Sequence, residues 1–432
     1  MPLRLDAADP GFAAAFDRMV ADRREQDADV GETVAAIVAD VRARGDAALL
    51  DYTERFDRVR PAAGGLAIGA GERAAAVATV PAEVRAALAL AAERIRAFHL
   101  RQMPQDDRYT DAAGVRLGQR WRPVAAAGLY VPGGKAAYPS SVLMNAIPAM
   151  TAGVRRLVMT VPVPDGVLNG AVLLAAELAG VSEIYRVGGA QAIAALAYGT
   201  ESIAPVDTIV GPGNAYVAAA KRQVFGQVGI DSIAGPSEIL VLADGGNDPA
   251  WIAADLLSQA EHDEVAQAIL ITDDAGFADA VAAAVDSHLA VLPRAGIAAQ
   301  SWQRYGALIV VPDLAAGVAL ANRLAPEHLE LAVAEPAALL ERIDNAGAVF
   351  VGRHTPEAVG DYVAGPNHVL PTGRTARFSS GLSVFDFLRR SAVIECDAAA
   401  LAEIGPAAMI LAEAEGLPAH ALSIGIRLNR RA

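Results

Sequence analysis

The sequence predicts an α/β protein built from two parallel-sheet halves, and three observations lead to this fold class. The chain has 432 residues, of which 53% are hydrophobic, so it is long enough for two or more domains with their own cores. Short apolar segments alternate with helical ones from about residue 121 onward. This alternation occurs twice, before and after residues 235–236. Alternating strands and helices are typical of parallel sheets covered by helices.

The first part of the chain is predicted to be helical. Residues 31–56 and 81–102 carry Ala, Leu, Val and Ile at helical spacing, with charged residues between them. His99 stands alone in the second segment and is interpreted as a surface or packing residue. The N-terminus lacks the apolar core of a signal peptide. The uncharged run 136–154 contains two prolines and is interpreted as a buried loop and helix, not a membrane span.

The two halves of the α/β region are predicted element by element from their apolar patterns. The first half is predicted to contain strands at 157–163, 184–187 and 208–210 and helices at 167–178, 190–198 and 215–225. The second half is predicted to contain strands at 239–243, 268–272, 308–311 and 348–351 and helices from 249, at 276–289 and at 315–324. Residues 235–236 are the predicted junction between the halves.

Charge and cysteine content exclude several functional classes. A formal net charge of −14 opposes nonspecific binding to nucleic acid or to an anionic membrane surface. Anionic ligands must therefore be held by local features. The single cysteine, Cys396, excludes an intrachain disulfide and a cysteine-based zinc site, and it suits a reducing cytoplasm.

A pair of possible metal ligands lies in the helix that opens the second half. Asp248 and Pro249 form a strong helix start, because Asp is a preferred N-cap and Pro a preferred first residue. Gln259 and His262 follow three residues apart, which on a helix places both side chains on one face about 4.5 Å apart along the axis. This spacing suits two ligands of one ion. A solvent-exposed polar face is the alternative interpretation, and it is favoured for an isolated pair.

Glycine turns follow predicted strands in the first half. Gly188 and Gly189 lead into one helix, and Gly211 and Gly213 lead into the next. Backbone amides at helix starts bind phosphate oxygens, and glycine allows close approach of the ligand. The complete dinucleotide fingerprint is absent, because Tyr216 stands where its third glycine would fall. Two such turns still favour a nucleotide at the strand ends, with ordinary tight turns as the alternative.

Candidate acid–base residues lie in the second half and near the C-terminus. Glu327 and His328 are adjacent, in or beside a predicted loop, and such a pair can move protons near neutral pH. Asp361 and His368 lie in a loop broken by glycine and proline; a helix cap or turn is the alternative role for Asp361. His420 follows a helix end at Gly416, in a tail where a lone histidine usually has no function.

Taken in order, these motifs resemble the histidinol dehydrogenase family, which catalyses the last two steps of histidine biosynthesis. The resemblance extends through nearly the whole chain from about Arg122, in the blocks GLYVPGG, VGGAQAIAALAYG, VGPGN, AGPSE, LLSQAEH, APEHLEL, GDYVAGPNHVLPT, FSSGLSVFDF and EGLPAH. The resemblance implies two Rossmann-like parallel-sheet domains, a helical N-terminal segment and a C-terminal dimer-crossing tail. The implied division is an N-terminal arm at 1–24, a larger domain of 25–121 plus 239–381, an inserted NAD-binding domain at 122–238 and a tail at 382–432.

The resemblance also implies a set of site residues, cofactors and partners. One Zn²⁺ per subunit would be bound by Gln259, His262, Asp361 and His420. L-histidinol would contact Ser237, Gln259, His262, His328, Asp361, His368, Glu415 and His420. NAD would contact Tyr130, Gln191 and Asn214, and the proton acceptors would be Glu327 and His328. The family forms homodimers with shared active sites, so Glu415 and His420 would complete the centre of the neighbouring subunit.

The residues themselves favour a mechanism based on water. Oxidising an alcohol to a carboxylate takes two hydride transfers through an aldehyde, which must first gain an oxygen or sulfur nucleophile. Cys396 has no neighbouring histidine, so water activated by Glu327 is the better nucleophile. Four protein ligands favour a zinc that binds substrate over one that activates water. The alternatives are a zinc hydrolase, a noncatalytic nucleotide-binding protein, and a family relative that oxidises another amino alcohol or polyol.

Overall fold

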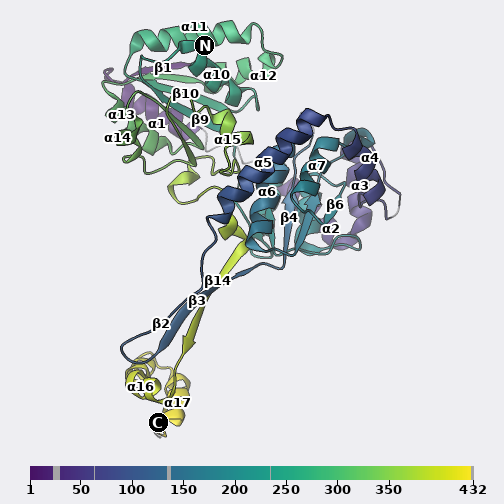
Figure 1. The fold of residues 1–432 in the computed structure, drawn as a ribbon, viewed down its shortest axis with the longest axis vertical. Coiled ribbons are helices and arrows are strands. Elements are labelled where there is room, and N and C mark those ends of the chain that lie inside the picture. Colours follow the sequence, from purple (N-terminus) through teal and green to yellow (C-terminus); the bar gives the residue numbers. More distant parts are fainter. Residues whose placement is uncertain (23–29, 63, 134–137, 234, 430–432) are drawn as a thin grey trace.

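The computed structural model describes residues 1–22, 30–62, 64–133, 138–233 and 235–429. Figure 1 shows two α/β bodies beside each other and a long antiparallel ribbon that extends away from them to the C-terminal helices. One body is built on a six-stranded sheet, the other on a five-stranded sheet, and the ribbon is a three-stranded sheet. The predicted fold of two Rossmann-like parallel-sheet domains is confirmed.

The six-stranded sheet is parallel throughout and has the order β1-β11-β10-β9-β12-β13. Its central strands are almost entirely apolar and buried on both faces, as parallel strands covered by helices must be. The strands are β1 (Leu3–Asp6), β9 (Glu238–Ala243), β10 (Gln267–Thr272), β11 (Ala307–Val310), β12 (His328–Ala332) and β13 (Ala348–Val351).

Helices cover both faces of this sheet. Ile239 and Val241 of β9 point to one face and Leu240 and Leu242 to the other, because side chains alternate along a strand. The first face is covered by α10 (Pro249–Ala260), α11 (Ala275–Leu289) and α12 (Ala295–Tyr305). The second is covered by α1 (Phe12–Asp22), α13 (Leu314–Leu324) and α14 (Pro336–Leu340).

The five-stranded sheet has the order β6-β5-β4-β7-β8 and is also parallel. Its strands are β4 (Ala126–Tyr130), β5 (Arg156–Thr160), β6 (Glu183–Tyr185), β7 (Thr208–Val210) and β8 (Gly229–Ile230). One face packs on α6 (Pro139–Ala152) and α7 (Gly170–Leu178), and the other on α8 (Gly189–Tyr198) and α9 (Ala215–Val224).

Both bodies share one strand order. Numbered from β4 or from β9, each sheet has the order 3-2-1-4-5, which is the order of the Rossmann fold. The order reverses between β4 and β7 in one sheet and between β9 and β12 in the other. Ligands of such sheets bind at the carboxyl ends of the strands where the order reverses.

The helices of residues 31–100 pack on the five-stranded sheet, in contrast to the predicted grouping of 25–121 with 239–381. α2 (Gly31–Arg44) and α3 (Asp46–Asp57) share a core with α8, and α4 (Ala70–Ala78) and α5 (Ala82–Leu100) share a core with α6 and α7. Their apolar faces need burial, and both faces of the six-stranded sheet are already covered by other helices. His99 of α5 is fully buried, so it is a packing residue.

The predicted N-terminal arm, in contrast, forms part of the six-stranded sheet. β1 forms its edge strand by pairing with β11, and Phe16 of α1 is fully buried in its core. Segment 1–22 therefore belongs to the body that contains 239–381. The single-residue break at Gly45, between α2 and α3, also divides the helix predicted at 31–56.

The C-terminal tail leaves the two bodies on an antiparallel ribbon. β14 (Leu388–Glu395) pairs with β3 (Arg116–Pro123), and β3 also pairs with β2 (Asp107–Thr110). The ribbon leads to α16 (Ala398–Ala414) and α17 (Pro418–Gly425), which lie at its end, far from the two α/β bodies in Figure 1. No single helix among the described residues is both long and apolar enough to span a membrane; α4 and α5 meet the requirements of length and composition only together, across a bend of 114°.

Candidate active site

The predicted acid–base residues Glu327 and His328 lie at the amino end of β12, beside the amino end of the neighbouring strand β9. β12 begins at His328, directly after Glu327, and pairs with β9, which begins at Glu238. The chain reaches this position through Ala325, which ends α13 in the left-handed conformation, and Pro326. Glu327 and His328 are both buried. The prediction placed the pair in or beside a loop, and His328 lies beside it, as the first residue of a central strand.

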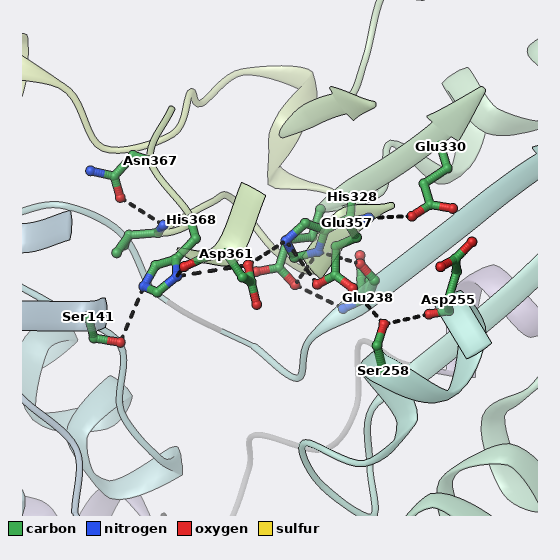
Figure 2. A network of polar contacts seen from close by, with 12 residues as sticks. Ser141, Glu238, Asp255, Ser258, His328, Glu330, Glu357, Asp361, Asn367 and His368 are labelled. Carbon is green, nitrogen blue, oxygen red and sulfur yellow. Dashed lines mark hydrogen bonds and ion pairs between the residues drawn. The ribbon is translucent and has the colours of Figure 1, made fainter. Parts of the chain in front are cut away.

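The backbone of Glu238 holds both side chains. Its carbonyl oxygen accepts a 3.0 Å hydrogen bond from Nδ1 of His328, and its N–H donates a 2.9 Å hydrogen bond to the Glu327 carboxylate. A carbonyl oxygen only accepts, so Nδ1 carries the proton of the neutral imidazole and Nε2 has the free lone pair. In Figure 2 the His328 ring lies in the middle of the polar network, between Glu238 and the carboxylates of Glu357 and Asp361.

Burial raises the pKa of Glu327 and lowers the pKa of His328. Loss of solvent raises the pKa of Glu327 well above its usual 4.5, and the hydrogen bond from Glu238 opposes this only in part. Loss of solvent also lowers the pKa of His328 to about 4, against the opposing effect of the Asp361 carboxylate. His328 is therefore neutral near pH 7 and able to accept a proton, while an ionised Glu327 is a stronger base than an exposed carboxylate.

Helix α15 (Glu357–Tyr362) brings two further carboxylates to His328. Oε1 of Glu357 lies 3.6 Å and Oδ1 of Asp361 lies 3.9 Å from Nε2 of His328. The two acidic residues are four apart, so they share one face of the helix. Ser258 of α10 donates a 3.0 Å hydrogen bond to Glu357, and burial raises the pKa of this carboxyl to about 8.

Among the described residues, three buried atoms of this region have no hydrogen-bond partner. They are Nε2 of His328, Oε1 of Glu357 and Oε1 of Gln259. Buried polar atoms are ordinarily hydrogen-bonded, so atoms of this kind indicate a ligand. His328, Glu357 and Asp361 can offer ligand atoms within 4.8 Å of one another, and imidazole with carboxylate is a suitable donor set for Zn²⁺.

The predicted metal pair lies at the end of α10. Gln259 is in the last turn of that helix and is buried, whereas His262 lies just beyond the helix end, with its N–H bonded to the Gln259 carbonyl at 3.1 Å. The spacing of three residues is thus realised in a turn, which corrects the predicted position of His262 on the helix. His262 contributes to the lowered pKa values of His328 and His368. The amide oxygen, imidazole and Asp361 carboxylate fit a zinc ion.

His368 joins the candidate site to the second body. Its Nδ1 donates a 3.0 Å hydrogen bond to the backbone oxygen of Asp361, and its Nε2 lies 3.2 Å from Oγ of Ser141 on α6. Burial lowers the pKa of His368. A cavity of about 390 Å³ is lined by His328, Asp361 and His368 among others. Ser237, directly before β9, lies at the same edge of the six-stranded sheet.

Two predicted site residues are far from this cavity within one chain. Glu415 follows α16 and His420 lies in α17, and both are exposed at the end of the ribbon. The helix end predicted at Gly416 is confirmed, and a second helix begins at Pro418. Within one chain, α10, which carries Gln259 in its last turn, is bonded to α15, which carries Asp361, through the Ser258–Glu357 hydrogen bond, whereas His420 lies far away at the end of the ribbon.

The candidate cofactor residues lie at the carboxyl edge of the five-stranded sheet. Tyr130 ends β4, Gln191 lies in the first turn of α8, and Asn214 caps α9 by accepting bonds from the N–H groups of residues 216 and 217. The Tyr130 hydroxyl accepts a 3.2 Å hydrogen bond from Gly189, and burial raises its pKa to about 12. Oε1 of Gln191 is buried without a partner. These residues fit a dinucleotide, because they lie where the strand order reverses.

A second cavity, of about 320 Å³, lies at the same edge. It is lined by the turns that follow β4 and β5 and by the start of α7, including Pro132, Gly133, Pro162, Val163 and Asn169. Gly133 and Gly188 are both required there, because a Cβ atom on either would lie 2.5 or 2.6 Å from the Pro162 ring. Gly134 of the GLYVPGG block lies outside the described residues.

Sequence reasoning missed three residues of the candidate site. Glu357 was available as the residue after Pro356, four positions before Asp361, which is the spacing of one helix face. Glu238 acts through its backbone, and Ser141 comes from a helix of the other body, so neither has a sequence signal.

These features define a class of protein. A Rossmann-like sheet with glycine turns at its carboxyl edge is joined to a buried imidazole and carboxylate that can move protons. The fold and the site are those of a two-domain oxidoreductase that depends on a nicotinamide dinucleotide.

Within that class, the chain belongs to the histidinol dehydrogenase family. The family model described as histidinol dehydrogenase matches residues 20–428. Histidinol dehydrogenase of Rhodospirillum rubrum is 64% identical over 431 residues, which cover 100% of this chain and 99% of the relative. That of Ruegeria pomeroyi is 63% identical over 430 residues, with coverage of 100% and 99%. The crystal structure of histidinol dehydrogenase from Elizabethkingia anophelis has a TM-score of 0.94 at 36% identity and covers 99% of this chain and 98% of that one.

Proposed function

We propose that this chain oxidises L-histidinol to L-histidine through bound L-histidinaldehyde, using one Zn²⁺ per subunit and two NAD in succession. These are the last two steps of histidine biosynthesis. The observation that carries the proposal is the buried Glu327–His328 pair, which is held by the backbone of Glu238 and has His328 in the wall of a cavity. A biosynthetic oxidoreductase of this kind would work in the cytoplasm.

The proposed zinc ligands are Gln259, His262 and Asp361, with His420 from a second subunit. When bound, the metal would hold the imidazole and amine of the substrate, and the nicotinamide would accept hydride. The alternative set of His328, Glu357 and Asp361 shares one member with this set. We propose the first set, because it leaves Nε2 of His328 free to accept a proton while Nδ1 is bonded to Glu238.

The residues of the chain divide the proton transfers between them. Nε2 of His328 takes the hydroxyl proton while the first hydride leaves the alcohol carbon. Glu327 then removes a proton from water that adds to the aldehyde carbon, while Nε2 of His328 returns its proton to the aldehyde oxygen, giving the hydrated aldehyde. Nε2 of His328, neutral again, takes a proton from one hydroxyl group of the hydrate as the second hydride leaves to the second NAD, and the resulting acid releases its remaining proton to solvent as the carboxylate. Ser237 and His368 would hold the substrate, and Tyr130, Gln191 and Asn214 would hold NAD.

Each proposed role is assigned to one part of the fold. Residues 122–238 would bind NAD, 239–381 would contain most of the zinc and catalytic site, and the tail at 382–432 would complete the site of a partner in a homodimer. The exposed positions of Glu415 and His420 at the end of the ribbon support a shared site, because in one chain they are far from the cavity.

The deciding experiment counts NADH formed per L-histidinol with NAD in excess. Two NADH per substrate is the expected result. One NADH per substrate, or none, would assign the chain to a relative that oxidises another amino alcohol or polyol.

Subunit mixing tests the shared site. Glu327→Ala and His420→Ala variants, each inactive alone, should regain about a quarter of wild-type activity when denatured together and refolded, because mixed dimers contain one intact site. No recovery would place His420 in the site of its own chain. A Cys396→Ser variant, changed at an exposed residue outside the site, is the control for refolding yield.

A further inference from the structure

A buried ion pair lies beside the glycine turn that carries Asn214. Lys221 of α9 and Asp231, directly after β8, are in contact, and their side chains are 3% and 4% exposed. Neither residue belongs to the proposed catalytic or ligand-binding set. Both charged groups are buried, so their hydrogen bonds to other residues indicate their role.

Both polar groups of the Gly211 backbone bind to this pair. Nζ of Lys221 donates a 3.0 Å hydrogen bond to the Gly211 carbonyl, and the Gly211 N–H donates a 2.8 Å hydrogen bond to Oδ2 of Asp231. Gly211 has a φ of +115°, and a Cβ atom there would lie 2.1 Å from the carbonyl oxygen of Tyr130. The turn is therefore pressed against the end of β4 in a conformation that only glycine adopts readily.

The ion pair also reaches the segment between the two bodies. Oδ1 of Asp231 accepts a 2.6 Å hydrogen bond from the N–H of Ser232. Ser232 belongs to the seven residues, 231–237, between the end of β8 and the start of β9. That segment leads to Ser237 and Glu238 at the candidate active site. One carboxylate thus binds both the turn before Asn214 and the start of the connection to the catalytic body.

We propose that Lys221 and Asp231 are positioning residues for the cofactor. Through their hydrogen bonds to both polar groups of the Gly211 backbone, they fix the turn that presents Asn214. This inference rests on the proposed function, because it requires NAD to contact Asn214.

Stability alone does not account for the arrangement. Replacing a buried ion pair by apolar residues of similar volume is often neutral or stabilising, because the charges lose their hydration on burial. What such a replacement removes here is the set of backbone hydrogen bonds to Gly211 and Ser232. A double replacement therefore separates positioning from folding.

The test compares NADH binding in two double variants, using NADH fluorescence titration and thermal unfolding. Lys221→Met/Asp231→Leu should fold. Its Kd for NADH should rise about 10-fold, because the turn at Gly211 has lost its hydrogen bonds to Lys221 and Asp231. Its KM for L-histidinol should change less than its KM for NAD. Lys221→Met/Asp231→Asn retains an acceptor for the Gly211 N–H and should recover part of the lost affinity.

A matched control uses another ion pair of the same sheet. Arg156 and Glu183 begin β5 and β6 at the opposite, amino edge and are bonded at 2.8 Å. Arg156→Met/Glu183→Gln should leave the Kd for NADH unchanged. A folded Lys221→Met/Asp231→Leu protein with wild-type NADH affinity would overturn the positioning role. If Asn214→Ala also leaves NADH binding unchanged, the proposed cofactor contact fails instead.

Discussion

Nδ1 of His328 donates a 3.0 Å hydrogen bond to the carbonyl oxygen of Glu238, and this bond fixes which ring nitrogen is free for chemistry. The two residues begin neighbouring parallel strands, so the rigid sheet sets the direction of the ring. Nε2 is left facing the carboxylates of Glu357 and Asp361, with no hydrogen-bond partner of its own. The free nitrogen of a neutral imidazole is thereby placed at the cavity wall as a proton acceptor.

Replacing His328 by asparagine should separate orientation from base chemistry. In His328→Asn the side-chain amide N–H can still donate to the Glu238 carbonyl, but the side chain at position 328 can no longer accept a proton. We expect kcat for L-histidinol to fall by about 10²- to 10⁴-fold, with NADH affinity unchanged. Steady-state kinetics and NADH titration provide both values. A loss of kcat smaller than about tenfold would show that another group takes the hydroxyl proton.

Replacing Glu327 by glutamine should affect the second oxidation more than the first. The Glu327 carboxylate accepts the Glu238 N–H at 2.9 Å, and the amide of Glu327→Gln can keep this bond while losing the ability to remove a proton from water. We expect a larger loss of kcat with L-histidinaldehyde than with L-histidinol, measured separately in stopped-flow experiments. Equal losses in both half-reactions would assign Glu327 to a step that the two reactions share.

Metal removal should abolish turnover without preventing cofactor binding. The proposed ligands Gln259, His262 and Asp361 lie at the amino edge of the six-stranded sheet, whereas Tyr130 and Asn214 lie at the carboxyl edge of the other sheet. We expect chelator-treated protein to lose L-histidinol oxidation, to regain it with Zn²⁺, and to bind NADH with a Kd within about twofold of the untreated value. Full activity in protein shown by elemental analysis to be metal-free would contradict the zinc role.

Several strands and helices of the two sheets could be predicted because their apolar patterns are local signals, whereas β1, β4, β8 and β12 were not predicted. The alternation of apolar strands and helices gave β7 and β13 with their bounds, and Asp248 before Pro249 gave the start of α10. β12 was missed because the motif at 327–328 looked like a polar loop. His328 is nevertheless buried in a central strand, since its ring bonds to the neighbouring strand instead of to water.

Tertiary relationships had no comparable signal. The helices of 31–100 are amphipathic, but their sequence does not show which sheet their apolar faces cover; the structure places them on the five-stranded sheet. The backbone bonds of Glu238 and Gly211 are likewise invisible in the sequence, because any residue type has an N–H and a carbonyl group. The list of site residues came from the family motifs, and the contacts of Glu357 and Ser141 came from the structure alone.

His99 should make the fold sensitive to acid. The ring is fully buried on α5, where Nδ1 lies 2.8 Å from the carbonyl oxygen of Ile95, and burial lowers its pKa below the usual 6.5. The unfolded chain then binds a proton near pH 6.5 that the folded chain does not. Wild-type stability should therefore fall as the pH drops from about 6.5 towards the lowered pKa of His99, by at most about 1.4 kcal/mol per pH unit from this group.

Substituting His99 by leucine should remove that contribution. The free energies of unfolding of wild type and His99→Leu, measured by urea titration at several pH values between about 5 and 8, should differ by an amount that depends on pH. Above the unfolded pKa the difference should be constant, because the ring is neutral in both states and only packing and the bond to Ile95 are changed. Below it the difference should shift in favour of the leucine variant. A constant difference across the whole range would mean that His99 is protonated equally in the folded and unfolded chains.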